Sequence, residues 1–74
     1  MAQGAERGLE VLDTLASDER IVRHHRYHAI RAHLLEMAGD GPAARASYET
    51  AARLTTSLPE QRYLEARAAR IDQA

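Results

Sequence analysis

The chain has 74 residues, a formal net charge of −1 and no cysteine. This length limits it to one domain with a small core, and the missing thiols exclude disulfides and cysteine-ligated metal sites. A charge near zero provides no overall field that would draw the chain to nucleic acid. No apolar run approaches the roughly 20 residues of a transmembrane helix, and the N-terminus lacks the apolar segment of a signal peptide, so we expect a cytoplasmic protein without membrane contact.

Apolar residues recur at helical spacing along the first half of the chain. Leu9 and Leu12 belong to a stripe that predicts a helix over residues 5–16. Ser17 is placed to cap a second helix, over residues 18–38, because two acidic residues that suit the positive end of the helix dipole follow it. The inward face of this second helix is predicted to comprise Ile21, His25, Ala29, Ala32 and Leu35.

Turn signals divide the second half into two further helices. Gly39 suits the left-handed conformation that ends a helix, and Pro42 suits the first turn of the next one. Ser57 and Glu60 predict a capping box before the last helix. The predicted helices cover residues 42–56, with Ala44, Tyr48, Ala51, Ala52 and Leu54 inward, and residues 58–72, with Leu64, Ala68 and Ile71 inward. Four helices without a strand pattern predict an all-α fold.

Small residues lie where two antiparallel helices would approach each other most closely. Ala32, Gly39, Ala44 and Ala51 surround Tyr48 at the spacing of the small and aromatic positions in a tetratricopeptide hairpin. Such hairpins stack into surfaces that hold other proteins. A generic antiparallel hairpin also needs small residues, and the proline that usually follows the second helix comes late. The pattern favours a tetratricopeptide-like domain of antiparallel hairpins with about four helices.

Four histidines crowd the predicted second helix. His24 and His28 are one helical turn apart, a spacing that can chelate a metal ion, but zinc needs three or four ligands and no cysteine or H-E-x-x-H motif supplies the others. We assign no metal and no cofactor, and a pH or metal sensor built on this helix is an alternative function. The competing interpretation is that these rings, with His25 and His33, pack beside neighbouring tyrosines.

The same helix is locally basic, a composition that nucleic-acid contact requires. Its acidic neighbours and the overall charge favour a solvated face, or ion pairs with the first helix through Asp13 or Glu10. Nucleic-acid contact is therefore an alternative that we do not expect. No phosphate-binding loop or nucleophile elbow is present in the sequence, so we expect no enzymatic activity. The four basic residues are Arg20, Arg23, Arg26 and Arg31.

Three blocks of the sequence, in this order, are similar to a known family. They are RHHRYHAIRAHLL at 23–35, AARASY at 43–48 and TTSLPEQRYL at 55–64. The chain resembles the C-terminal extension of a group of bacterial extracytoplasmic-function (ECF) sigma factors, in which a tetratricopeptide-like domain follows the two domains that bind DNA and RNA polymerase. The resemblance spans residues 8–71. It implies a regulatory extension, excised or encoded alone, that acts through protein contacts and brings no catalytic residue.

These observations together predict that residues 1–74 form a protein-interaction module that modulates transcription initiation by such a sigma factor. The expected partners are the sigma domains of the same parent protein or RNA polymerase. Each repeat of a solenoid buries its apolar face on a neighbour, so both ends of a short solenoid are expected to be open. The candidate interaction surface, through which we also expect weak self-association, is Leu9 and Leu12 at one end and Leu64 and Ile71 at the other.

Overall fold

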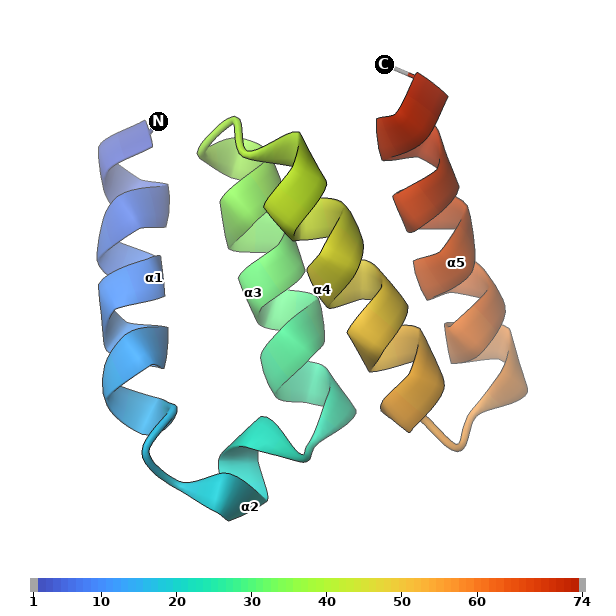
Figure 1. The fold of residues 1–74 in the computed structure, drawn as a ribbon, viewed down its shortest axis with the longest axis horizontal. Coiled ribbons are helices and arrows are strands. Elements are labelled where there is room, and N and C mark those ends of the chain that lie inside the picture. The colour runs from blue at the N-terminus through green and yellow to red at the C-terminus, as the bar shows by residue number, and fades with distance from the viewer. Residues whose placement is uncertain (1, 74) are drawn as a thin grey trace.

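The computed structural model describes residues 2–73, which form an all-α domain, as predicted. Its helices are α1 (Ala2–Leu15), α2 (Glu19–Val22), α3 (His25–Met37), α4 (Gly41–Leu54) and α5 (Leu58–Gln73). The four longer helices lie side by side in chain order and alternate in direction, while the short α2 links α1 to α3 at one edge (Figure 1). The arrangement is thin, because its principal extents are 31 × 29 × 15 Å.

The predicted turn between α3 and α4 is confirmed. Gly39 has a φ of 87°, in the left-handed region that side chains disfavour. The Asp40 carboxylate caps α4 by accepting a hydrogen bond from the Ala43 amide at 3.2 Å. Pro42 lies in the first turn, where its missing amide hydrogen has no intrahelical partner to lose. Local chemistry therefore fixes how α3 ends and α4 begins.

The capping box before α5 is half formed. The Ser57 hydroxyl accepts a long hydrogen bond, 3.4 Å, from the Glu60 amide, as predicted. The Glu60 carboxylate does not reach back to Ser57. It accepts from the Thr55 hydroxyl at 2.9 Å and pairs with His25 Nε2 at 2.6 Å. Glu60 thus ties the start of α5 to the start of α3.

The prediction of one helix over residues 18–38 is wrong in one respect. Arg23 and His24 lie outside both helices and separate α2 from α3. His24 has an extended backbone, with φ −86° and ψ 132°. A continuous helix would join the Arg26 amide to the Val22 carbonyl. Instead the Arg26 amide donates to His24 Nδ1 at 3.2 Å, and the Val22 carbonyl accepts from His28 Nε2 at 2.6 Å. The two histidines satisfy the donor and the acceptor that the break leaves open.

Asp18 caps α2, so the predicted cap at Ser17 is wrong by one residue. The Asp18 carboxylate accepts from the Arg20 amide at 2.9 Å. The Ser17 hydroxyl instead donates to the Thr14 carbonyl at 3.2 Å, because the last turn of α1 offers it a local acceptor. Ser17 therefore belongs to the end of α1, and the cap of α2 is the Asp18 carboxylate.

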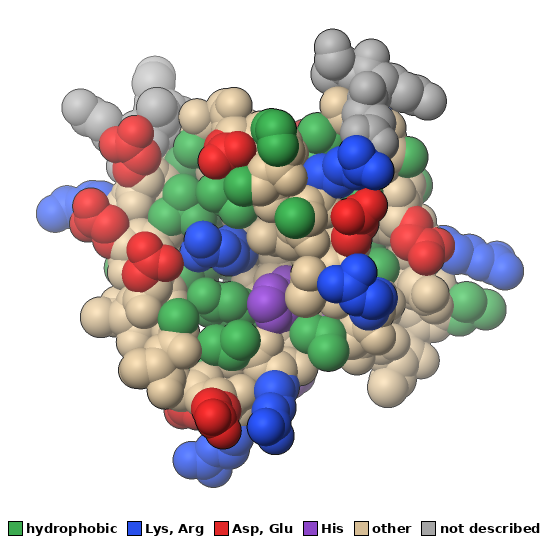
Figure 2. Space-filling model, in the orientation of Figure 1, with side chains coloured by type: hydrophobic (Ala, Val, Ile, Leu, Met, Phe, Trp, Pro, Cys, Tyr) green, Lys and Arg blue, Asp and Glu red, His purple; other side chains and the backbone are tan. Residues whose placement is uncertain are grey.

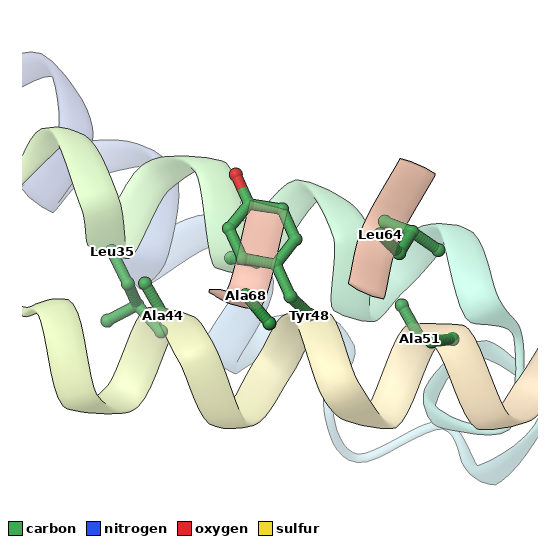
Figure 3. Packing of buried hydrophobic residues seen from close by; sticks show 8 residues of the cluster. Leu35, Ala44, Tyr48, Ala51, Leu64 and Ala68 are labelled. Atoms are coloured by element: carbon green, nitrogen blue, oxygen red, sulfur yellow. The ribbon is translucent and has the colours of Figure 1, made fainter. Parts of the chain in front are cut away.

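Alanines let α3 and α4 approach closely, as the hairpin pattern predicts. Ala32, Ala44, Ala51 and Tyr48 have no exposed surface. The Tyr48 ring rises from α4 among these small residues, with its hydroxyl directed away from the helix (Figure 3). The inward position predicted for Leu54 is wrong, because this last residue of α4 is 40% exposed. A core built largely from alanine buries little apolar area per residue, so we expect modest stability.

A glycine sets the approach of α1 to α3. A Cβ atom added at Gly8 would lie 2.9 Å from Leu34 Cδ1, so a larger residue would force the two helices apart or displace the leucine. Arg31 of α3 reaches Asp13 of α1, with 3.2 Å between Nη1 and Oδ1. This contact confirms the predicted ion pair between the basic helix and the first helix.

Candidate interaction surface

The structure buries two of the four residues that were predicted to form open apolar ends. Leu64 is 2% exposed and Leu12 is also buried. Leu9 and Ile71 are half-buried and pack against the core. The predicted surface is therefore wrong for Leu64, because adjoining helices of the same domain already cover it, and Leu12 exposes only a small part of its side chain.

A different apolar surface is open where α1, α2 and α3 meet, and we call it the α1–α3 groove. It has a volume of about 420 Å³. The buried side chains of Leu12 and Tyr27 form its floor, while Leu15 and Ile30 remain well exposed, Ile30 by 45%. Ile21, half-buried, completes the apolar lining. Helical periodicity had placed Leu12 on the apolar stripe of the first helix and Ile21 on the inward face of the second, but periodicity does not show whether another element covers such a face.

Basic groups border the α1–α3 groove. Arg20, His24 and Arg26 complete its lining, and none of the described lining residues is acidic. The Arg20 side chain is 95% exposed and lies 3.9 Å from the Asp18 carboxylate, an arrangement that contributes little in water. Among the side chains that the structure describes, residues 4–71, Arg26 takes part in no ion pair. The groove is therefore apolar at its floor and positive along its border.

The arginines of α2 and α3 do not form a continuous basic face. Arg23 lies 3.9 Å from Glu19, and Arg31 is paired with Asp13. On the face shown in Figure 2, acidic and basic side chains are interspersed among apolar ones, and no broad area of that face carries a single sign. Affinity for nucleic acid comes from clustered cations that neutralise phosphates. The arginines that lie close together in the sequence therefore do not form one continuous positive surface in the fold.

The histidines serve as internal hydrogen-bond partners. The spacing argument for His24 and His28 as a metal pair fails, because His24 lies outside the helix that contains His28. One ring nitrogen of each already bonds a backbone group. In the part of the chain that the structure describes, no three His, Asp or Glu side chains are grouped as metal ligands would be. His25 and His33 contact side chains of α5 and α4, respectively.

A polar cluster closes the core where α3, α4 and α5 meet. The Tyr48 hydroxyl donates to Glu36 Oε1 at 2.8 Å and lies 2.9 Å from His33 Nδ1. Arg67 Nη2 pairs with the same carboxylate oxygen at 2.6 Å. Burial and the hydrogen bond to Glu36 raise the pKa of Tyr48 to about 12. The Tyr48 hydroxyl, with help from Arg67, lowers the pKa of Glu36 against the opposing effect of burial. We interpret the cluster as structural, because its polar groups bind one another across three helices.

Comparisons with protein-family models, with curated proteins and with solved structures find no match to the chain. Within residues 2–73, no helix combines the length and the apolar character that crossing a membrane requires. Function is therefore inferred from the residues and from the geometry of the α1–α3 groove.

Proposed function

We propose that this chain is a protein-interaction module that regulates a bacterial ECF sigma factor. The observation that carries the proposal is the α1–α3 groove, in which exposed Leu15 and Ile30 stand beside an apolar floor. Binding of a partner that excludes water from such an apolar surface is favourable. The resemblance of the sequence to sigma-factor extensions indicates the class of partner, which is the sigma domains of the parent protein or RNA polymerase.

A tetratricopeptide-like arrangement is part of this proposal. In it, α3 and α4 form one hairpin, α1 corresponds to the end of a preceding repeat, and α5 corresponds to the start of the next. Helices of successive repeats then contact each other as well as their own partners. The contact of His25 with Glu60 and the ion pair of Glu36 with Arg67, which join α3 to α5, support this interpretation.

Binding and transcription measurements test the proposed function. The chain is titrated calorimetrically into RNA polymerase and into the two sigma domains encoded in the same or the adjoining reading frame, purified without an extension. Run-off transcription is then measured with and without the chain. We expect saturable binding to at least one of these partners and a change in transcript yield.

A variant that loses the fold provides the control for these measurements. Tyr48→Asp places a charge where Tyr48 has no exposed surface, so it is expected to unfold the domain and abolish binding. If the folded chain binds neither the sigma domains nor the polymerase and leaves transcript yield unchanged, the proposed function is refuted.

A further inference from the structure

We infer that the α1–α3 groove receives an amphipathic helix of the partner, with apolar side chains on its floor and carboxylates opposite Arg20 and Arg26. The inference rests on the proposed function, since it takes the partner to be a protein. It goes further by naming the surface that binds and the chemistry of the segment that is bound.

The domain itself shows how a helix is seated beside two antiparallel helices. α5 packs Leu64 and Ala68 into the core formed with α3 and α4. A polar pair, Arg67 with Glu36, closes the border of that contact. The α1–α3 groove has the same elements, namely an apolar floor from two antiparallel helices and charged side chains at its border, but no helix of residues 2–73 occupies it. An apolar stripe repeating every three or four residues fits a floor of this kind.

The charge of the border selects an acidic segment. The guanidinium groups of Arg20 and Arg26 have no strong partner within the described residues, and none of the described residues that line the groove carries a carboxylate. This positive border is local, because the whole chain carries a net charge of −1. Carboxylates flanking an apolar stripe would therefore be attracted to the border, whereas lysines in the same positions would be repelled.

The size of the groove favours a single helix over a second copy of the domain. Eight of the described residues line the groove. A stable interface between two folded proteins buries about 800 Å² on each partner and involves roughly 20–30 residues a side. One helix laid into the groove can cover its floor with two or three apolar side chains, so the occupant is a linear segment.

A peptide titration tests the chemistry of the groove directly. The probe is a synthetic helical peptide with leucine at every third or fourth position and glutamate between the leucines, and binding is followed by NMR on the isotope-labelled chain. We expect saturable shifts of the backbone amides that surround the groove, which belong to α1, α2 and the part of α3 near Ile30. The same peptide with lysine in place of glutamate is expected to bind roughly tenfold more weakly at low salt. Equal affinity for the two peptides, no binding, or shifts centred between α4 and α5 would overturn the inference.

Matched variants separate the groove from the general surface. Ile30→Glu is expected to weaken binding of the glutamate peptide by about tenfold or more, since it removes an apolar anchor. Met37→Glu is its control, because Met37 is 60% exposed on the same helix but lies outside the groove. Arg26→Glu is expected to reverse the preference between the two peptides, whereas Arg62→Glu on α5 is expected to leave it unchanged. Circular dichroism confirms that each variant is folded.

The groove inference and the proposed function fail in different ways. If the sigma domains or polymerase bind the chain but Ile30→Glu binds them as tightly as the wild type, the groove inference is wrong and the proposed function stands. If the glutamate peptide binds in the groove but neither the sigma domains nor the polymerase binds, the partner class is wrong and the groove inference stands. A dimer that light scattering detects in the wild type but not in Ile30→Glu would show that a second copy covers the groove and would overturn the groove inference.

Discussion

The Tyr48 hydroxyl is expected to stabilise the fold measurably, and Tyr48→Phe tests this. The substitution keeps the buried ring but removes an oxygen that contacts Glu36 at 2.8 Å, His33 at 2.9 Å and Arg67 at 3.4 Å. Leaving a buried polar group without a partner costs about 1–3 kcal/mol. Glu36 keeps its contact with Arg67 at 2.6 Å, and both side chains are reached by water. We therefore expect a loss of about 1–2 kcal/mol, in the lower part of that range.

This loss is large for so small a domain. At 74 residues the free energy of unfolding is expected to be about 4–11 kcal/mol. Each kcal/mol lowers the melting temperature of a domain of this size by about 4–8 °C. Urea unfolding followed by circular dichroism measures the change, with Tyr63→Phe as the control. Tyr63 is half exposed, so its variant is expected to stay within about 0.5 kcal/mol of the wild type. Equal unfolding midpoints for Tyr48→Phe and the wild type would refute the structural role of the hydroxyl.

The same hydroxyl predicts a loss of stability at alkaline pH. The pKa of Tyr48 is raised from 10.0 to about 12 in the folded chain, so the folded state retains a proton that the unfolded state releases. The contribution is complete below pH 10 and is lost as the pH rises toward 12. Stability measured against pH in this window should fall less steeply in Tyr48→Phe than in the wild type. Equal slopes would contradict the raised pKa.

Four further substitutions, with Gly4→Ala as the comparison for Gly39→Ala, test the packing, the turn and the helix break. Ala44→Leu is expected to cost about 1–3 kcal/mol by overpacking the contact of α3 with α4, and an unchanged melting temperature would argue against that close approach. Neither Gly39 nor Gly4 would place an added Cβ within 4 Å of another atom, so backbone conformation alone decides the effect of an alanine there. Gly39→Ala should destabilise by about 1 kcal/mol because Gly39 has a positive φ. Gly4→Ala inside α1 should stabilise by about 0.5–1 kcal/mol. His28→Ala removes the hydrogen bond to the Val22 carbonyl and is expected to cost about 1–3 kcal/mol, which thermal unfolding would detect.

The sequence by itself determined the helical class and most helix boundaries. These features depend on local chemistry, so they can be inferred from neighbouring residues. Gly39 adopts the left-handed conformation that its position suggested, and Pro42 lies in the first turn of α4. The hairpin core was also predictable, because the small residues around Tyr48 allow two helices to approach closely. Ala32, Ala44 and Ala51 are accordingly buried.

Only the tertiary structure decided where the second predicted helix breaks and which apolar residues remain open. At the break His28 Nε2 donates to the Val22 carbonyl six residues earlier, a hydrogen bond that hydrophobic periodicity does not encode. Ile30 of α3 and Leu64 of α5 are both large aliphatic residues within helices, yet Leu64 packs into the core while Ile30 stays 45% exposed beside the α1–α3 groove. A stripe specifies which face of a helix is apolar, whereas burial depends on whether another helix lies against that face.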